Sequence, residues 1–313
     1  MHVLMTFRLP DDALARLRER VGESQVHIVA RETPDYERWL GEAEVAMGAI
    51  PAADLPRAAK LRWMQLPSAG VGRFADIMPN GAILTNASGV FGVPIAEHVL
   101  AMMLGFAHQL PRAVRAAVRA RWDTTGLRFE LAGQTVCIVG LGDIGRELAR
   151  RCKALDMRIL AVRRAPQGTK PDFVDELGDI TSLERLLGPA DHVVNALPDT
   201  KATHELFDAG RFAQMHRGAY FYNVGRGGTV VEPALIQALN QGHLAGAGLD
   251  VFAAEPLPGD SPLWKMENVI ITPHRAGDTP HNARRLAEIF LANLDRFLRG
   301  HPLQNVVEAD KGY

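Results

Sequence analysis

Cysteine is scarce in this chain, which has two cysteines, Cys137 and Cys152, among 313 residues. Two thiols exclude a disulfide framework and a zinc centre built from thiolates, and no motif suggests another metal site. An excess of either charge is also missing, because 35 Lys+Arg stand against 36 Asp+Glu. A dedicated nucleic-acid binder carries a strongly basic domain, so this balance argues against a nucleic-acid partner.

Long apolar runs are missing as well. The most apolar helical stretch, residues 93–110, is interrupted by Glu97, His98 and His108, which indicates a buried helix and not a membrane span. The opening residues 1–7 have neither a basic segment nor a long apolar one, so we expect no signal peptide. The sequence therefore predicts a cytoplasmic protein with no membrane partner.

What the sequence does contain is an alternation of short apolar runs with helical patterns. At roughly 150 residues per domain the length favours two domains, and strands that alternate with helices are typical of parallel α/β sheets. A last helix, predicted over 279–298, follows both series of strands, so we expect the chain to return to its first domain. We therefore predict an α/β protein of two doubly wound, Rossmann-like or flavodoxin-like parallel-sheet domains, with a domain of residues 97–280 inserted in a discontinuous one of residues 1–96 and 281–313. Strands are predicted at 3–7, 26–30, 45–50, 62–66 and 82–85, and then at 135–139, 158–162, 192–196, 219–223, 246–249 and 269–271.

A glycine-rich loop identifies the inserted domain. Gly140-Leu-Gly142-Asp-Ile-Gly145 lies between a predicted strand and a predicted helix, the context that a dinucleotide-binding loop requires. Gly142 would let a pyrophosphate approach the backbone, and the N–H groups at the start of the helix would bind it. The alternative is a plain strand–helix turn. We favour the nucleotide site, which makes the discontinuous domain the substrate domain.

The residues after the next strand bear on which dinucleotide binds. An NAD site has an acidic residue there, which binds the ribose hydroxyls. Here Arg163 and Arg164 follow the strand 158–162. Two guanidinium groups would pair with a 2′-phosphate, although a solvated arginine pair is the alternative. We predict that NADP(H) is preferred and leave NAD(H) open.

Three polar residues follow three strands in the last third of the chain. Arg226, Glu255 and His274 each lie shortly after the carboxyl end of a predicted strand. Ligands of open α/β sheets bind at that edge. A lone histidine or arginine is usually structural or solvated, but three such groups downstream of a dinucleotide loop favour an active site.

At this point the sequence resembles the D-isomer-specific 2-hydroxyacid dehydrogenase family along nearly the whole chain. The motifs are Pro67-Ser-Ala-Gly-Val71, Ala96-Glu97-His98, the glycine loop, Gly246–Pro258 and Pro273–Gly277. The resemblance implies reversible reduction of a 2-oxoacid to a D-2-hydroxyacid with catalytic Arg226, Glu255 and His274. It implies that the backbone of Ala69, Gly70 and Val71, with Arg226 and His274, binds the substrate, and that Asp250 contacts the nicotinamide carboxamide. The further cofactor contacts that it implies are Gly142, Asp143, Ile144, Arg163, Arg164, Leu197, Pro198, Thr203, Val224, His274 and Gly277.

One departure from the family pattern concerns the cofactor. Most members have Asp where Arg163 stands, whereas the NADPH-preferring glyoxylate/hydroxypyruvate reductases carry basic residues there. The chain therefore resembles those reductases. Dehydrogenases of phosphoglycerate, formate or phosphite, or a nucleotide-sensing corepressor with the same fold, are the alternatives.

Family resemblance also implies a homodimer. A row of arginines, Arg112, Arg115, Arg119 and Arg121, lies on the predicted helical region 94–121. The row is either a solvated helix face or subunit contact, or a surface for anions or nucleic acid. We favour the solvated face or subunit contact because the chain is charge-balanced. The segment 112–121 is our candidate for the subunit contact.

Overall fold

The computed structural model describes residues 1–31, 33–72, 74–79, 81–164 and 169–308. The chain forms two compact units, one of Met1–Phe91 with Thr279–Tyr313 and one of Gly92–Asp278. The boundaries thus differ from the predicted positions 96/97 and 280/281, and residues 309–313 of the predicted second segment lie outside the described residues. The first boundary lies earlier because helix α4 begins at Gly92, and a continuous helix stays within one unit.

The first unit is built on a five-stranded sheet in which every pair is parallel. Its order, β2-β1-β3-β4-β5, is the flavodoxin-like one. Helices α1 and α10 pack on one face of this sheet and α2 on the other. The elements are β1 (His2–Met5), α1 (Asp11–Val21), β2 (Val26–Ile28), α2 (Pro34–Leu40), β3 (Ala43–Met47), β4 (Trp63–Gln65), α3 (Phe74–Ile77), β5 (Ile83–Thr85) and α10 (Asn282–Leu298), with short 3₁₀ turns η1 (Glu23–Gln25) and η2 (Leu55–Arg57).

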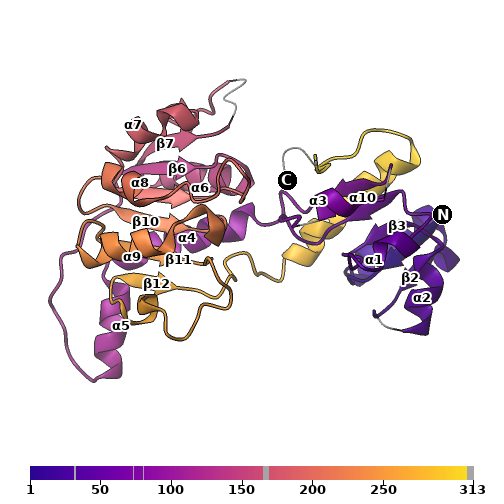
Figure 1. Cartoon of the computed structure of the whole chain (residues 1–313), viewed down its shortest axis with the longest axis horizontal. Helices are drawn as coiled ribbons and strands as arrows, with labels where there is room; N and C mark the ends of the chain where they lie inside the picture. Colours follow the sequence, from indigo (N-terminus) through magenta and orange to yellow (C-terminus); the bar gives the residue numbers. More distant parts are fainter. Residues whose placement is uncertain (32, 73, 80, 165–168, 309–313) are drawn as a thin grey trace. The chain divides into compact units, whose positions relative to one another are not determined.

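The second unit is built on a seven-stranded parallel sheet in the order β12-β11-β10-β9-β6-β7-β8 (Figure 1). The order reverses beside β6, as in dinucleotide-binding folds. Its helices are α4 (Gly92–Ala107), α5 (Leu110–Val118), α6 (Asp143–Ala154), α7 (Leu183–Leu187), α8 (Ala209–Gln214) and α9 (Glu232–Asn240), and its strands are β6 (Thr135–Val139), β7 (Arg158–Val162), β8 (Glu176–Gly178), β9 (His192–Asn195), β10 (Tyr220–Asn223), β11 (Gly246–Leu249) and β12 (Val269–Ile271). Three 3₁₀ turns, η3 (Ile180–Ser182), η4 (Gly227–Thr229) and η5 (Pro262–Lys265), complete it.

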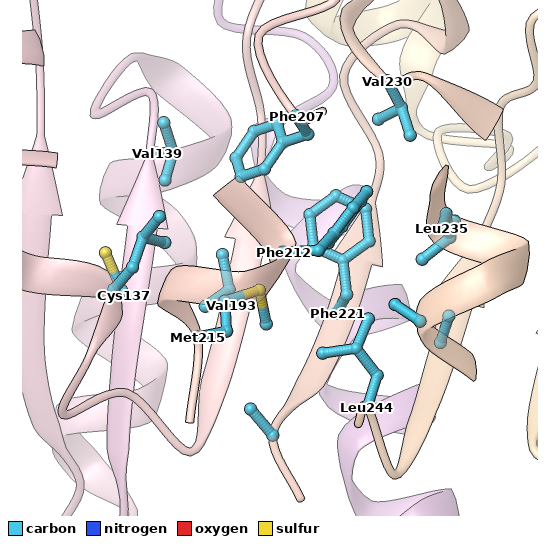
Figure 2. Packing of buried hydrophobic residues seen from close by; sticks show 14 of the residues in the cluster. Cys137, Val139, Val193, Phe207, Phe212, Met215, Phe221, Val230, Leu235 and Leu244 are labelled. Carbon is cyan, nitrogen blue, oxygen red and sulfur yellow. The ribbon is translucent and has the colours of Figure 1, made fainter. Parts of the chain in front are cut away.

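Alternate residues of the central strand β6 enter two separate cores. Cys137 and Val139 pack with α7, α8 and α9 on one face, where Phe212 and Phe221 meet edge to face with ring centroids 5.2 Å apart (Figure 2). Val136 and Ile138 pack with α4 and α6 on the other face. Strands covered on both faces carry continuous apolar runs, which is why the sequence predicts these strands well.

Two predictions about the elements need correction. Strand β8 was not predicted, because a three-residue edge strand that contains Glu176 has no apolar run. The helical region expected over 94–121 is two helices, since Gln109 has φ 57° and Pro111 lies in the first turn of α5. No helix within the described ranges is long and apolar enough to cross a membrane.

Candidate active site

Five strands of the second unit end level with one another. Val139, Asn195, Asn223, Leu249 and Ile271 are successive register partners across the sheet from β6 to β12. The glycine loop and the three predicted catalytic segments all begin directly after this row. The register therefore brings groups that are far apart in the sequence to one edge of the sheet, as the sequence predicts.

The glycine loop provides space for an anion at the start of α6. A Cβ added at Gly145 would lie 2.2 Å from the carbonyl oxygen of Gly140, so the loop and helix pack too closely for a side chain there. A Cβ added at Gly142 would have no described atom within 4 Å. Open space beside the free N–H groups of the first helical turn is what a pyrophosphate requires. The residues fit a dinucleotide, and Asp143 and Ile144 form the first turn of α6.

Arg163 and Arg164 directly follow β7, next to the strand that carries the glycine loop. Arg163 is half-buried, Arg164 is exposed, and the Arg163 N–H donates to the carbonyl oxygen of Gly178 at 3.1 Å. Both residues take part in interactions within the chain. Their place at the end of β7 is the one from which the adenosine ribose is recognised in this fold.

A buried amide network, which the sequence did not reveal, holds the turn that carries Arg226. Nδ2 of Asn195 donates to Oδ1 of Asn223 at 3.0 Å and to Oγ1 of Thr229 at 2.6 Å. Asn223 and Thr229 in turn both donate to the carbonyl oxygen of Arg226, at 3.2 and 2.6 Å. The three side chains are buried and hydrogen-bonded, which fixes the turn. The asparagines at the ends of β9 and β10 are the sequence feature from which this network could have been predicted.

Gly227 brings this turn against the loop that carries Glu255. A Cβ at Gly227 would lie 1.8 Å from the carbonyl oxygen of Phe252, so glycine is required. The charge of Arg226 consequently acts on Glu255. Nη1 of Arg226 donates to the carbonyl oxygen of Gly225 at 2.7 Å, and the side chain is half-buried.

Glu255 and His274 form a direct pair. Nδ1 of His274 lies 2.7 Å from Oε2 of Glu255, while Oε1 accepts the N–H of Phe252 at 3.0 Å. Partial burial alone would raise the pKa of Glu255, but the hydrogen bonds from His274 and Phe252 and the charge of Arg226 outweigh it, so the pKa is lowered. The carboxylate is therefore ionised at neutral pH. Because it contacts Nδ1, Nε2 is the imidazole nitrogen that Glu255 does not bind. The structure thus brings Arg226, Glu255 and His274 together.

Asp250 is buried at the end of β11, beside these groups. Its carboxylate accepts the N–H groups of Arg275 and Ala276, both at 3.0 Å, and the hydroxyl of Thr272 at 2.6 Å. It thus binds the loop that carries His274, a role that the sequence did not predict. Its expected contact with a nicotinamide stays a prediction.

The remaining predicted cofactor residues lie at the same edge. Leu197, Pro198 and Thr203 follow β9, where the hydroxyl of Thr203 donates to the carbonyl oxygen of Pro198 at 2.6 Å. Val224 follows β10, and Gly277 lies in the His274 loop. The predicted substrate residues Ala69, Gly70 and Val71 belong to the first unit, where Nδ2 of Asn86 donates to the carbonyl oxygen of Ala69 at 3.0 Å. Their role stays a prediction.

The chain is similar to known proteins over nearly its whole length. Residues 100–276 match the model of the D-isomer specific 2-hydroxyacid dehydrogenase NAD binding domain. The chain is 33% identical to glyoxylate/hydroxypyruvate reductase B of Citrobacter koseri over 97% of each chain. It is 32% identical to D-3-phosphoglycerate dehydrogenase of Archaeoglobus fulgidus over 98% of this chain, and it spans 59% of the length of that relative.

A solved structure shares the whole architecture. The NADPH-dependent glyoxylate/hydroxypyruvate reductase from Sinorhizobium meliloti, in complex with NADP and sulfate, superposes with a TM-score of 0.85 at 28% identity. The match covers 99% of each chain.

Proposed function

Since the chain belongs to the D-isomer specific 2-hydroxyacid dehydrogenase family, we propose that it reduces a small 2-oxoacid to the D-2-hydroxyacid with NADPH. The observation that carries the proposal is the pair of Glu255 and His274 beside Arg226, at the strand ends next to the glycine loop. Glyoxylate and hydroxypyruvate are the proposed substrates, because the similar reductases are named for them.

His274 is the proposed proton donor. NADPH, when bound, supplies the hydride that reduces the substrate carbonyl carbon. Nε2 of the protonated imidazole then gives its proton to the carbonyl oxygen, and the ionised Glu255 stabilises the charged ring and holds its Nδ1–H. Proton transfer in the reverse direction, from hydroxyl to neutral imidazole, serves the oxidation of the hydroxyacid.

Arg226 is the proposed anchor for the substrate. A guanidinium group binds a carboxylate through two parallel hydrogen bonds, and it polarises the neighbouring carbonyl group. The amide network of Asn195, Asn223 and Thr229 would fix that orientation. The backbone of Ala69, Gly70 and Val71 is proposed to bind the same carboxylate.

The cofactor preference follows from charge. Gly142 and the first turn of α6 would bind the pyrophosphate, and Arg163 and Arg164 the 2′-phosphate that distinguishes NADP(H) from NAD(H). No acidic residue stands between β7 and Arg164 to bind ribose hydroxyls. NAD(H) would bind more weakly, because no carboxylate at this position binds its ribose hydroxyls.

A homodimer is the proposed assembly, and an apolar row on α5 favours it. Leu110, Val114 and Val118 recur every four residues and are exposed, and Trp122 beyond the helix is 94% exposed. Three of the four arginines of this segment are engaged within the chain: Arg112 and Arg121 pair with Asp123 at 3.0 and 2.9 Å, and Arg115 donates to the carbonyl oxygen of Glu267. We therefore expect the apolar row, and not the arginines, to meet the second copy.

The proposal is tested by following NADPH absorbance with purified protein. Glyoxylate, hydroxypyruvate, a bulkier 2-oxoacid and 3-phosphohydroxypyruvate are compared, each with NADPH and NADH. Turnover of a small 2-oxoacid with NADPH is expected, together with the D-product in a chiral assay. Turnover of the phosphorylated substrate alone would favour a phosphoglycerate dehydrogenase, and absence of turnover with all four would contradict the proposed reaction.

A further inference from the structure

We propose that His98, Thr272 and Asp250 form a hydrogen-bond chain that positions His274 for proton transfer. His98 belongs to the motif Ala96-Glu97-His98, to which the proposed function gives no role. None of the three would touch the reacting carbonyl group, so they are positioning residues. The role of His274 in this inference rests on the proposed function. The hydrogen-bond chain itself rests on contacts that the structure describes.

The hydrogen-bond chain ends at the backbone directly after His274. Asp250 accepts the N–H groups of Arg275 and Ala276, which directly follow His274. His274 itself has φ 53°, a left-handed conformation that a non-glycine residue adopts only when its surroundings impose it. The two hydrogen bonds from a buried carboxylate are such a constraint. They hold the backbone that aims the ring at Glu255.

The direction of the chain follows from counting protons. The hydroxyl of Thr272 donates its single proton to Oδ1 of Asp250, 2.6 Å away. Nε2 of His98 lies 3.0 Å from the same hydroxyl oxygen. Because that oxygen has no second proton, Nε2 of His98 must carry one and donate it. The chain therefore runs from His98 through Thr272 to Asp250.

Close packing of α4 on the sheet makes the chain possible. A Cβ at Gly248 of β11 would lie 2.7 Å from Sδ of Met102, so glycine lets the helix approach the strand closely. His98 lies one helical turn before Met102 and so occupies the same face of α4. That face reaches Thr272, which directly follows β12. The hydrogen bond between His98 and Thr272 thus joins residues that are 174 positions apart in the sequence.

Arg226 is held by a different set of residues, and this separation predicts a kinetic split. Asn195, Asn223 and Thr229 bond to the Arg226 turn, and no described side-chain hydrogen bond links them to His98, Thr272 or Asp250. The two sets meet in a backbone hydrogen bond of the sheet, from the N–H of Asp250 to the carbonyl oxygen of Asn223 at 3.0 Å. Loosening the His274 loop should lower kcat. Loosening the Arg226 turn should raise KM for the 2-oxoacid.

The first test compares two variants of one residue. Thr272→Val keeps the shape but removes the hydroxyl, and misplacement of an acid by about 1 Å lowers kcat roughly 10- to 100-fold. We expect that loss with KM for the 2-oxoacid changed by less than about twofold. Thr272→Ser restores the hydroxyl and should restore kcat. Thr229→Val is the matched comparison, with a raised KM expected, and Thr229→Ala, which also removes the hydroxyl, replaces it if the valine variant does not fold.

The second test addresses His98. His98→Gln keeps an N–H donor and should retain most of kcat, whereas His98→Phe removes the donor and should lower kcat as Thr272→Val does. Equal kcat in His98→Phe and wild type, or equal losses in His98→Phe and His98→Gln, would overturn the role of His98.

A readout independent of turnover separates this inference from the proposed function. Hydrogen–deuterium exchange of a peptide covering residues 273–278 reports the amides that Asp250 binds. Faster exchange in Thr272→Val and His98→Phe than in their conservative counterparts is expected. Unchanged exchange and unchanged kcat would overturn the chain. If the variants exchange as expected but the wild-type protein reduces no 2-oxoacid, the result would support the hydrogen-bond chain and contradict the proposed function.

Discussion

Nδ1 of His274 lies 2.7 Å from Oε2 of Glu255, although 19 positions of sequence separate the two residues. The pKa of Glu255 is lowered, since its hydrogen bonds and the charge of Arg226 outweigh its partial burial, so the carboxylate faces the imidazole in ionised form at neutral pH. The proposed reduction requires a proton on this ring, and the ionised carboxylate is the hydrogen-bond partner of the ring.

Replacing this carboxylate should therefore move the pH profile. In Glu255→Gln the protonated imidazole loses its ionic partner, so the decline in reduction rate with rising pH should begin at a lower pH than in wild type. Oxidation, which needs the neutral ring, should be retained at lower pH. Profiles of kcat/KM in both directions measure this, with the exposed Glu267→Gln as control. Superimposable profiles would contradict the pairing.

The arginines after β7 should control cofactor choice. Removing both charges in Arg163→Gln/Arg164→Gln should raise KM for NADPH roughly 10- to 100-fold and change KM for NADH far less, because only the former carries a 2′-phosphate. Arg158→Gln, at the start of the same strand, is the matched control. Equal losses with both cofactors would rule out the 2′-phosphate contact.

Substitutions of Gly142 and Gly145 in the phosphate loop should have different effects. Gly142→Ala places a methyl group in open space, so stability should be kept while NADPH affinity falls about tenfold or more. Gly145→Ala places it 2.2 Å from a backbone oxygen and should cost about 1–3 kcal/mol of unfolding free energy. Denaturant unfolding and fluorescence titration with NADPH measure the two effects. A stable Gly142→Ala variant with wild-type affinity would place the pyrophosphate elsewhere.

Buried His192 should make the second unit sensitive to acid. It contacts the hydroxyl of Tyr222 at 3.0 Å and Oε1 of Gln134 at 2.6 Å, and burial lowers its pKa to about 4. Between the unfolded pKa of about 6.5 and about 4 the unfolded chain binds the proton and the folded chain does not. Stability that is fully present above pH 6.5 should therefore fall by about 3 kcal/mol as the pH drops to 4.

This acid sensitivity is checked by measuring the free energy of unfolding from pH 7 to pH 4. His192→Asn should flatten the dependence over that window, and exposed His301→Asn should leave it as in wild type. An equal slope in His192→Asn would assign the acid sensitivity to other groups.

The apolar row on α5 should control the oligomeric state. Val118 is 83% exposed, and Val118→Asp should convert a dimer to a monomer because a charge would be buried at the contact. Arg119→Asp, on the next residue, should leave the mass unchanged. Light scattering coupled to size-exclusion chromatography measures both. A monomeric wild-type protein would contradict the dimer.

The sequence by itself determined the parts of the molecule that depend on local pattern. Strands β6, β7, β11 and β12 have the predicted bounds, because buried parallel strands are continuous apolar runs. The glycine loop was recognisable because a strand, three glycines and a helix are consecutive. Arg226, Glu255 and His274 could be selected because parallel strands present their carboxyl ends at one edge.

Only the tertiary structure decided which side chains hold those groups in place. Asn195 meets Thr229 across 34 positions and His98 meets Thr272 across 174, and no periodicity in a sequence records such pairings. The sequence likewise gave no sign that three of the arginines near α5 are engaged within the chain while an apolar row is exposed. The reason is physical: a hydrogen bond depends on the distance and angle between two groups in the folded chain, and packing of helices on the sheet sets both.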